Sequence, residues 1–501
     1  MASLVKEYSK EKLTGQIFTP FFIVNKILDD VGYNTPEILG KTILDPACGD
    51  GRFLIKIAER IIKYSTKEEL KQNLEKIYGW DIDAEAVSLA INHLNNLVKP
   101  YDVKINWNIK VLNSLQKGIS KFDLFTQNTT KTEKFDFIVG NPPYIRIQHL
   151  DLKERAFIQN HFRFCKSGST DIYIAFYELA LNLLKETGKA GYITPNTFFH
   201  TDTAKELRKY FATHQNLIQI TNYGQIQLFE NATTYSAIVI FDKHKHDKFK
   251  FQSAIDKNLF QERFIDFSEI QRQKFWQLTI KKQKTKKGKR LGDIAKIHVG
   301  ITTLVDKIYM MPFVKTEGDY IYLKSKYNGI IKFEKEILKP IIKVSTLKNS
   351  DEPIKEYVLF PYKKVNGKHT IIPENQLKEK YPLAYQYLLS VKDYLDKRDN
   401  GKPNKVAWYA FGRSQGLDTS FGNKILFSPM NKKPNFIYHK NEEATFYSGY
   451  CIKYDGDYEK LLEQLNSERM EEFIRISSRD FRGGWKAYNK KIVQEFMIYE
   501  E

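Results

Sequence analysis

The chain has 501 residues, which at roughly 100 to 200 residues per domain allows two to four domains. Lys and Arg together number 79 against 60 Asp and Glu, and this net charge of +19 favours a polyanionic partner such as nucleic acid or an acidic membrane surface. The hydrophobic content of 42% excludes a disordered chain. No run of about 18 apolar residues is present to cross a bilayer, so membrane spanning is excluded and no membrane partner is expected.

The cysteines indicate a reducing compartment. Cys48, Cys165 and Cys451 lie far apart and form no CxxC pair, so the sequence predicts neither a disulfide framework nor a zinc site, and no metal is expected. The first residues, MASLVKEYSKEKLTG, lack the apolar stretch of a secretory signal. A cytoplasmic location is therefore expected.

Short β-type runs alternate with longer helical runs between residues 42 and 243, which is typical of a parallel sheet covered by helices. The predicted strands are 42–45, 76–82, 109–113, 135–140, 190–195, 217–224 and 235–242, and the predicted helices are 51–64, 84–97, 171–186 and 203–214. The last two strands lack an obvious helix between them, so we expect the seventh to pair antiparallel to its neighbour. This pattern predicts an α/β fold with a seven-stranded mixed sheet.

The alternation fades after about residue 245, and the segment KKQKTKKGKR (281–290) carries seven positive charges in ten residues. Beyond it, short aromatic and β-branched runs are interrupted by Pro and Gly, with one convincing helix near 458–475. We therefore predict a first domain over 1–245, a basic connecting segment over 246–290 and a second domain over 291–501.

The first motif is DPACGDGRFL (45–54), in which a strand end is followed by a Gly-containing turn that opens a helix. Ligands of open α/β sheets bind at the carboxyl ends of strands, where such a turn lets the backbone approach a nucleotide-like molecule. The spacing differs from G-x-G-x-x-G, and no G-x-x-x-x-G-K-[ST] occurs, so phosphate binding has little support. An ordinary strand-to-helix turn remains an alternative.

The second motif is Asp81 in GWDID, at the end of the next predicted strand. An acidic side chain there can accept hydrogen bonds from both hydroxyl groups of a ribose. The alternative is an N-cap for the helix that begins near Ala84, although Asp83 is better placed for that role.

The third motif, Asn141-Pro142-Pro143-Tyr144, directly follows the apolar run FDFIVG. Two prolines fix the backbone and remove its amide donors, so the Asn141 side-chain oxygen and the Pro142 carbonyl become rigid acceptors. An exocyclic amino group held by both acceptors would have its lone pair drawn out of conjugation, which raises its nucleophilicity. Tyr144 offers a flat face for stacking a heterocycle. The alternative is an ordinary Pro-Pro loop.

In this order the motifs resemble the gamma class of DNA adenine N6-methyltransferases of type II restriction–modification systems, which use S-adenosyl-L-methionine. The matching segments are TGQIFTP (14–20), DPACGDG, Asp81, NPPY and DIYIAFYELALNLLK (171–185). The resemblance implies a Rossmann-like methyltransferase domain followed by a C-terminal α+β target-recognition domain.

The resemblance also implies roles for single residues. Thr19 and Pro20 would lie near the methionine end of the cofactor together with Asp45, Pro46, Ala47, Gly49 and Asn141, while Asp81 and Ile82 would hold its ribose and adenine. Phe176 would border the cofactor adenine, and Phe229 would be the second aromatic side chain that stacks the target base with Tyr144. Asn113 and Ser114 would also contact the cofactor. The family usually carries Asp where Asn113 stands, but an amide can still accept one hydrogen bond and donate another.

Methylation of a base inside a duplex requires the nucleotide to be flipped out, so we expect double-stranded DNA held by its backbone. The predicted contacts are the basic run 281–290, the segment 475–491 with Arg479, Arg482, Trp485 and Lys486, and the pair Arg413 and Gln415, which could read guanine and adenine. The alternatives are a solvated linker for the first and a turn with a core tryptophan for the second. For Arg413, the alternative is a phosphate contact or a salt bridge.

The sequence thus predicts site-specific transfer of a methyl group to N6 of adenine in double-stranded DNA. A cognate restriction endonuclease is a candidate partner, and a monomer is expected. The alternatives are methylation of RNA or of a protein glutamine, a non-catalytic DNA-recognition subunit, and a fused nuclease, for which little chain remains.

Overall fold

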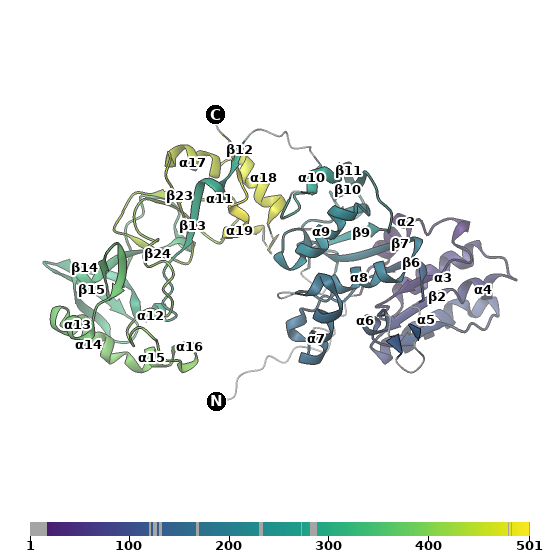
Figure 1. The fold of residues 1–501 in the computed structure, drawn as a ribbon, viewed down its shortest axis with the longest axis horizontal. Helices are drawn as coiled ribbons and strands as arrows, with labels where there is room; N and C mark the ends of the chain where they lie inside the picture. The colour runs from purple at the N-terminus through teal and green to yellow at the C-terminus, as the bar shows by residue number, and fades with distance from the viewer. Residues whose placement is uncertain are drawn as a thin grey trace. The chain divides into compact units, whose positions relative to one another are not determined.

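The computed structural model describes residues 18–119, 122–123, 128–129, 133–166, 170–229, 234–271, 273–280, 288–478, 480–481 and 483–499. The chain divides into two compact units, Met1–Gln283 and Lys284–Glu501 (Figure 1). Within the described ranges, no helix is both long enough and apolar enough to cross a bilayer.

A nine-stranded sheet forms the centre of the first unit as far as its residues are described. In spatial order its strands are β11 (Phe260–Asp266), β10 (Lys248–Ala254), β8 (Leu217–Asn222), β9 (Ser236–Phe241), β7 (Leu184–Pro195), β6 (Phe135–Gly140), β1 (Ile43–Asp45), β2 (Ile77–Asp81) and β3 (Asn108–Val111). The run from β7 to β3 is parallel throughout, whereas β9 is antiparallel to both of its neighbours. The predicted antiparallel position of the seventh strand is therefore confirmed.

The sheet has two strands more than predicted, and the first unit extends beyond residue 245. Strand β10 pairs parallel to β8, and β11 pairs antiparallel to β10. Phe249 and Phe251 of β10 are buried in the same core as the central strands. The predicted connecting segment 246–290 is thus corrected, because its first half completes the sheet and the division between the units falls after Gln283.

Helices cover both faces of this sheet, and each face has its own core. Side chains of α2 (Phe21–Asp30), α3 (Arg52–Tyr64) and α5 (Ala84–Val98) belong to one core, and those of α8 (Tyr173–Leu183) and α9 (Lys205–His214) belong to the other. The remaining elements of the unit are α4 (Leu70–Leu74), α6 (Ser114–Lys117), α7 (Leu152–His161), α10 (Phe267–Ile270) and the hairpin of β4 (Phe122–Asp123) and β5 (Asn128–Thr129). The four predicted helices are present as α3, α5, α8 and α9.

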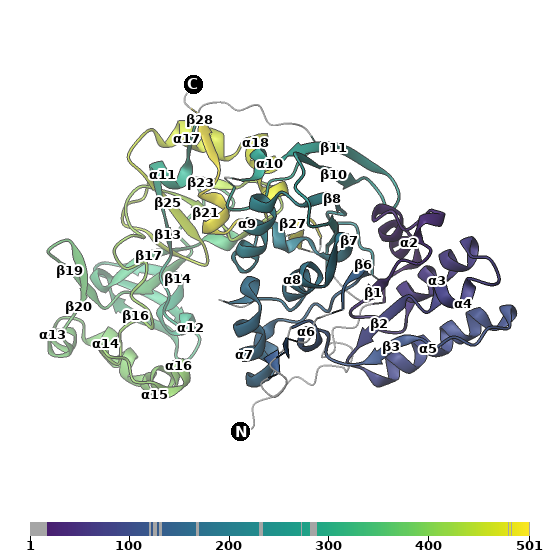
Figure 2. The same ribbon diagram turned by 45° about the vertical axis from the view of Figure 1, so that its right-hand side comes forward.

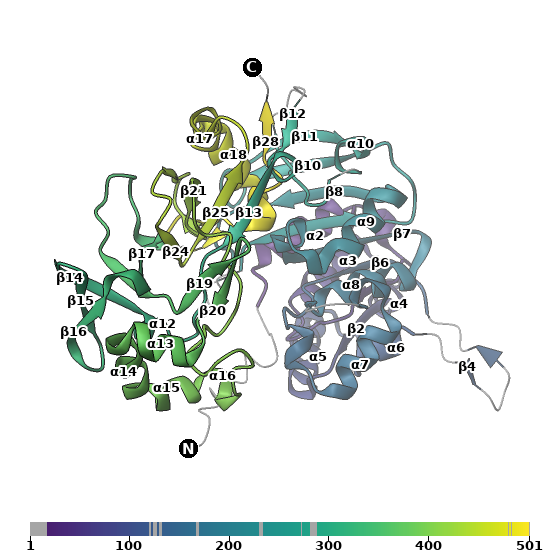
Figure 3. The ribbon, with the colours of Figure 1, turned by 60° about the vertical axis from the view of Figure 1, so that its left-hand side comes forward.

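The second unit combines several small sheets with short helices. A six-stranded sheet has the order β16 (Gly329–Glu334), β15 (Tyr320–Ser325), β14 (Met310–Glu317), β18 (Glu356–Leu359), β17 (Leu338–Lys343) and β24 (Thr445–Tyr447), and a four-stranded sheet has the order β13 (Ala295–Val299), β25 (Tyr450–Tyr454), β21 (Lys424–Phe427) and β23 (Phe436–His439). Figure 3 shows β14, β15 and β16 side by side. Two-stranded ribbons are formed by β12 (Gly288–Arg290) with β28 (Met497–Tyr499) and by β19 (Tyr362–Val365) with β20 (Lys368–Ile371).

The other elements of the second unit are a small sheet of β22 (Met430–Asn431), β27 (Trp485–Ala487) and β26 (Asp480–Phe481), and the helices α11 (Leu291–Ile294), α12 (Asp306–Tyr309), α13 (Glu374–Lys380), α14 (Pro382–Ser390), α15 (Lys392–Asp396), α16 (Arg398–Gly401), α17 (Tyr458–Leu465), α18 (Glu468–Ser477) and α19 (Lys490–Val493). The single helix predicted over 458–475 is divided into α17 and α18. The division occurs because Ser467 caps the second helix, its side chain accepting a hydrogen bond from the Met470 amide.

A buried arginine ties together the loops at one end of the first unit. Arg208 of α9 donates hydrogen bonds to the carbonyl oxygens of Phe198 (2.5 Å), Thr201 (2.8 Å) and Lys274 (2.9 Å). Only 2% of its surface is exposed. Because these carbonyl groups belong to two separate segments, the guanidinium holds the chain after α10 against the chain after β7.

We expect Arg208→Ala to lower the free energy of unfolding of the first unit by about 3 kcal/mol or more, because one buried and two partly buried carbonyl groups lose their donors. Urea denaturation followed by circular dichroism measures the change. The control is Lys209→Ala at the exposed neighbouring position. An equal effect of the two substitutions would contradict the role of Arg208.

Candidate active site

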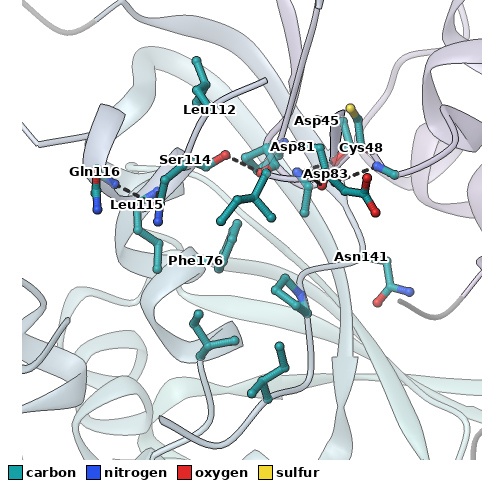
Figure 4. Close-up of a pocket in the computed structure, with 18 of the residues that line it drawn as sticks. Asp45, Cys48, Asp81, Asp83, Leu112, Ser114, Leu115, Gln116, Asn141 and Phe176 are labelled. Atoms are coloured by element: carbon teal, nitrogen blue, oxygen red, sulfur yellow. Dashed lines mark hydrogen bonds between the residues drawn. The ribbon is translucent and has the colours of Figure 1, made fainter. Parts of the chain in front are cut away.

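A cavity of about 360 Å³ lies at the carboxyl ends of β1, β2, β3 and β6. Its volume falls within the range of roughly 300 to 1,000 Å³ that is usual for small-molecule sites. Figure 4 shows Asp81 and Asp83 at one side of this cavity and Leu115 and Gln116 at the other. Its lining includes these predicted residues: Thr19, Asp45, Pro46, Ala47, Gly49, Asp81, Ile82, Asn113, Ser114, Asn141, Pro143 and Phe176. The structure thus brings together most of the residues predicted for cofactor binding.

The turn after β1 is held by hydrogen bonds that its backbone amides donate to carboxylates. Asp45 Oδ1 accepts a hydrogen bond from the Ala47 amide (3.0 Å), and Asp81 Oδ2 accepts one from the Gly49 amide (2.8 Å). Gly51 has a φ of +88°, and a Cβ atom at this position would lie 2.8 Å from the Cβ of Ala90. Glycine is therefore required at residue 51 both for the left-handed backbone and for the close packing of α3 on α5.

Asp81 links the turn after β1 to the start of α5. Its Oδ1 accepts a hydrogen bond from the Asp83 amide (2.9 Å), while Oδ2 holds Gly49. Asp83 itself caps α5 by accepting from the amides of Glu85 and Ala86. The N-cap is thus Asp83, as its position in the sequence indicates, and the Asp81 carboxylate lines the cavity.

Asp45 is a buried carboxyl group with a strongly shifted pKa. Burial raises its pKa to about 8, against the stabilising effect of the Ala47 amide, and the neighbouring Asp81 and Asp50 carboxylates raise it further. The cause is the loss of hydration of the charged form. A positively charged ligand in the cavity would stabilise the ionised form of Asp45.

The residues that follow β3 line the cavity on the side away from Asp81 and Asp83 (Figure 4). Asn113 Oδ1 accepts hydrogen bonds from the amides of Leu115 and Gln116 and so caps α6. The buried Ser114 hydroxyl donates to the Pro46 carbonyl (2.6 Å). Asn113 and Ser114 therefore connect the end of β3 to the turn after β1.

The Asn-Pro-Pro-Tyr segment enters the cavity directly beside Asp45. A Cβ atom on Gly140 would lie only 2.6 Å from Asp45 Oδ1, so glycine is required for this close approach. Asn141 lines the cavity, and its Nδ2 donates to the Thr19 hydroxyl (3.1 Å). This hydrogen bond fixes the side-chain amide and so defines the side on which its oxygen acceptor lies. Pro143 also contributes to the lining.

The two aromatic side chains predicted to stack a target base lie outside the cavity lining that the described residues form. Phe229 is 3% exposed and is part of the core under α2 and α3, rather than of the cavity. Tyr144 donates its hydroxyl to the Ile193 carbonyl (3.2 Å) and contacts the edge of Tyr173. The same lining lacks Pro142, which is buried, and Pro20, which precedes α2.

One wall of the cavity was not predicted from the sequence. Leu150, Glu154, Phe157 and Ile158, in and just before α7, line it together with Ile145 and Ile172. The sequence of α7, LKERAFIQNH, has its few apolar residues spread around the helix and buries only Ile158. No amphipathic pattern therefore indicated this helix.

In the second unit, a pocket of about 410 Å³ lies beside Gln415. Its lining includes Gly300, Thr302, Ser345, Gln415, Ser428, Met430, Ser448 and Tyr450. The Gln415 side chain donates to the Thr302 hydroxyl (2.7 Å), which orients both groups. We call this cavity the Gln415 pocket.

The other predicted DNA contacts differ in exposure. Arg413 forms an ion pair with Asp399 (3.2 Å), and Trp485 is 41% exposed with the Lys432 ammonium 5.8 Å from its ring centre. Lys486 is buried, which corrects its predicted place on the surface: its strand packs against β22 and β26. Arg479 and Arg482 lie outside the described residues, as do positions 281–287 of the basic run.

Comparisons with known proteins agree with the restriction–modification part of the resemblance. Residues 75–229 match the family described as Eco57I restriction-modification methylase. The sequence is 28% identical to the type II restriction enzyme and methyltransferase RM.Eco57I of Escherichia coli, over 95% of this chain and 56% of that protein. It is 26% identical to the type II methyltransferase M.BanIII of Aneurinibacillus aneurinilyticus, over 96% of this chain and 87% of that protein. The chain thus spans about half the length of RM.Eco57I.

Among solved structures, the type IIL restriction-modification enzyme MmeI in complex with DNA is similar in fold, with a TM-score of 0.57 at 12% identity over 95% of this chain and 65% of that chain. By sequence, this chain is similar to type II restriction–modification methyltransferases, and its residues 75–229 match the Eco57I-type methylase family.

Proposed function

We propose that this protein is a site-specific DNA methyltransferase that transfers a methyl group from S-adenosyl-L-methionine to N6 of adenine in double-stranded DNA. The observation that carries the proposal is that one cavity is lined both by the acidic turn after β1 and by Asn141 and Pro143. A cofactor seated against Asp45 and Asp81 would share its space with a group held at Asn141. We propose that the enzyme is the modification component of a type II system.

The cavity suits S-adenosyl-L-methionine in charge and in shape. Its acidic side, with Asp45 and Asp81, is complementary to a ligand that carries positive charge. The rest of its lining is largely apolar, with Ile82, Phe176 and the α7 wall available to a purine ring. When bound, this cofactor supplies an electrophilic methyl group on a positively charged sulfur. The Asp81 carboxylate would accept hydrogen bonds from the ribose hydroxyls.

In the proposed reaction, Asn141 and Pro142 hold the amino group of the target base. The Asn141 side-chain oxygen and the Pro142 carbonyl accept its two N–H groups, which draws the nitrogen lone pair out of the ring system. The lone pair would form a bond to the methyl carbon while the bond between that carbon and the sulfonium sulfur breaks, so that S-adenosyl-L-homocysteine leaves. The methylated nitrogen then loses one proton to solvent. Because the acceptors are fixed by the prolines and by the Thr19 hydrogen bond, no reorganisation is needed in the transition state.

The target adenine must leave the duplex to reach Asn141. We propose that Tyr144 and Phe229 stack the extruded base, which requires Phe229 to leave its buried position when DNA binds. We propose that the second unit recognises the DNA sequence, with Gln415 and Trp485 on the contact surface. The net charge of +19 supports a polyanionic substrate. A cognate endonuclease partner, the monomeric state and the cytoplasmic location stay predictions.

We expect Asn141→Ala to reduce methyl transfer to DNA by about 10²- to 10³-fold or more, because one of two fixed acceptors is lost. Cofactor affinity measured by calorimetry should change little, since the acidic turn is intact. Transfer of labelled methyl groups to plasmid DNA measures the rate. The control is Asn182→Ala on the exposed side of α8, and wild-type turnover in Asn141→Ala would refute the assigned role.

We expect Asp45→Asn to stabilise the ligand-free protein at pH 8 while weakening cofactor binding. The folded carboxyl has a pKa of about 8 against an ordinary value of 3.8, so the folded state loses stability as the pH rises from about 4 to 8. Asparagine cannot ionise and avoids this loss. Thermal unfolding should therefore give a higher Tm than wild type at pH 8 and no gain near pH 4.

The affinity of the same variant for S-adenosyl-L-methionine should fall roughly 30-fold or more, because a buried opposite charge is removed. The matched control is Asp247→Asn, at an exposed position. A lower Tm of Asp45→Asn than of the wild type at pH 8 would contradict the prediction, because it would show that Asp45 is ionised and paired in the ligand-free protein.

A further inference from the structure

We propose that the ribbon of β19 and β20 inserts into a groove of the substrate DNA beside the Gln415 pocket. The inference rests on the proposed function to the extent that DNA is the substrate. It adds a groove-reading element that no sequence motif indicated. The argument depends on the geometry of the ribbon, on its charge and on its attachment to the Gln415 pocket.

The ribbon is a regular antiparallel hairpin that forms a sheet of its own within the described residues. Val365 pairs with Lys368 across a two-residue turn of Asn366 and Gly367, whose φ angles are +50° and +81°. Such turns match the twist of the two strands and give a stable tip. Figure 2 shows β19 and β20 at one edge of the second unit. A two-stranded ribbon of this kind fits the major groove of B-DNA, which is about 12 Å wide.

The two faces of the ribbon differ in a way that suits insertion. On one face the root is anchored, because the Tyr362 hydroxyl accepts a hydrogen bond from the Phe411 amide (2.7 Å) and His369 contacts Asp418 (2.9 Å). On the other face, Lys363, Val365, Lys368 and Thr370 are all exposed. The ribbon is therefore rigid at its base and open to a partner along one side and at its tip.

The charge of the ribbon selects a polyanion as that partner. No Asp or Glu occurs between Glu356 and Glu374, whereas this stretch contains Lys363, Lys364 and Lys368. Lysines flanking an inserted ribbon would neutralise phosphates on either side of the groove. At the tip, Asn366 can donate to and accept from an adenine edge, and the 43%-exposed Val365 can contact a thymine methyl group.

The root of the ribbon and the Gln415 pocket belong to one connected substructure. Phe411 and Asp418, which anchor the ribbon, bracket the segment that carries Gln415. This segment is bound to the chain after β13, since the Gly412 amide donates to Thr303 and Gln415 donates to Thr302. DNA seated over the pocket would thus meet the ribbon in a fixed register.

The first test is the double variant Lys364→Ala/Lys368→Ala, assayed for binding to a mixed-sequence duplex over a range of salt concentrations. Loss of two phosphate contacts should reduce the slope of log K against log salt by about 1.8 and weaken binding at low salt. The control is Lys335→Ala/Lys460→Ala, two exposed lysines elsewhere in the second unit, which should leave the slope unchanged. A wild-type slope in the ribbon variant would overturn the proposal.

The second test is Asn366→Gly, which keeps the left-handed turn and removes only the side chain. Sequencing of modified bases in plasmid DNA should show a relaxed preference at one position of the methylated site, whereas an unchanged site would exclude base reading by the tip. Wild-type protein that binds duplex DNA without methylating it would refute the proposed reaction, and the salt slopes would still decide the role of the ribbon. Absence of duplex binding by wild type would overturn both proposals.

Discussion

The candidate active site depends on a buried carboxyl group placed where two loops meet. Asp45 ends β1, orders the turn that follows it and leaves no space for a side chain on Gly140 at the start of the Asn-Pro-Pro-Tyr segment. The proposed cofactor site and the proposed acceptors at Asn141 are therefore in contact through a single residue. This arrangement destabilises the ionised form of Asp45, because burial of the carboxyl group raises its pKa to about 8.

Most of the first unit could be predicted because its elements are locally encoded. Strand β9 is a continuous apolar run, helices α3 and α5 each have one apolar face, and the cap of α5 is readable from Asp83. Strand β10 was missed because Lys248 and Lys250 alternate with its buried phenylalanines, in a segment that reads as basic. Helix α7 was missed because most of its residues face solvent, although it supplies a wall of the cavity.

The second unit is encoded by contacts between distant residues, which no local pattern specifies. Strand β13 pairs with β25, and Lys486 is buried because its strand lies between β22 and β26. Arg413 forms an ion pair with Asp399, and Asp399 and the next residue, Asn400, have left-handed backbone conformations. Most of the residues that motifs predict for cofactor binding do line the cavity, whereas the surface proposed to read DNA required the structure.

The pairing of β12 with β28 brings the first and last described strands of the second unit side by side. A polypeptide segment whose ends meet in this way can be exchanged as a unit by genetic recombination. Recombination before β12 and after β28 would leave the fold of the second unit intact. Under the proposed function, such an exchange would replace the unit that recognises the DNA sequence and leave the turn around Asp45 and the Asn141 segment unchanged.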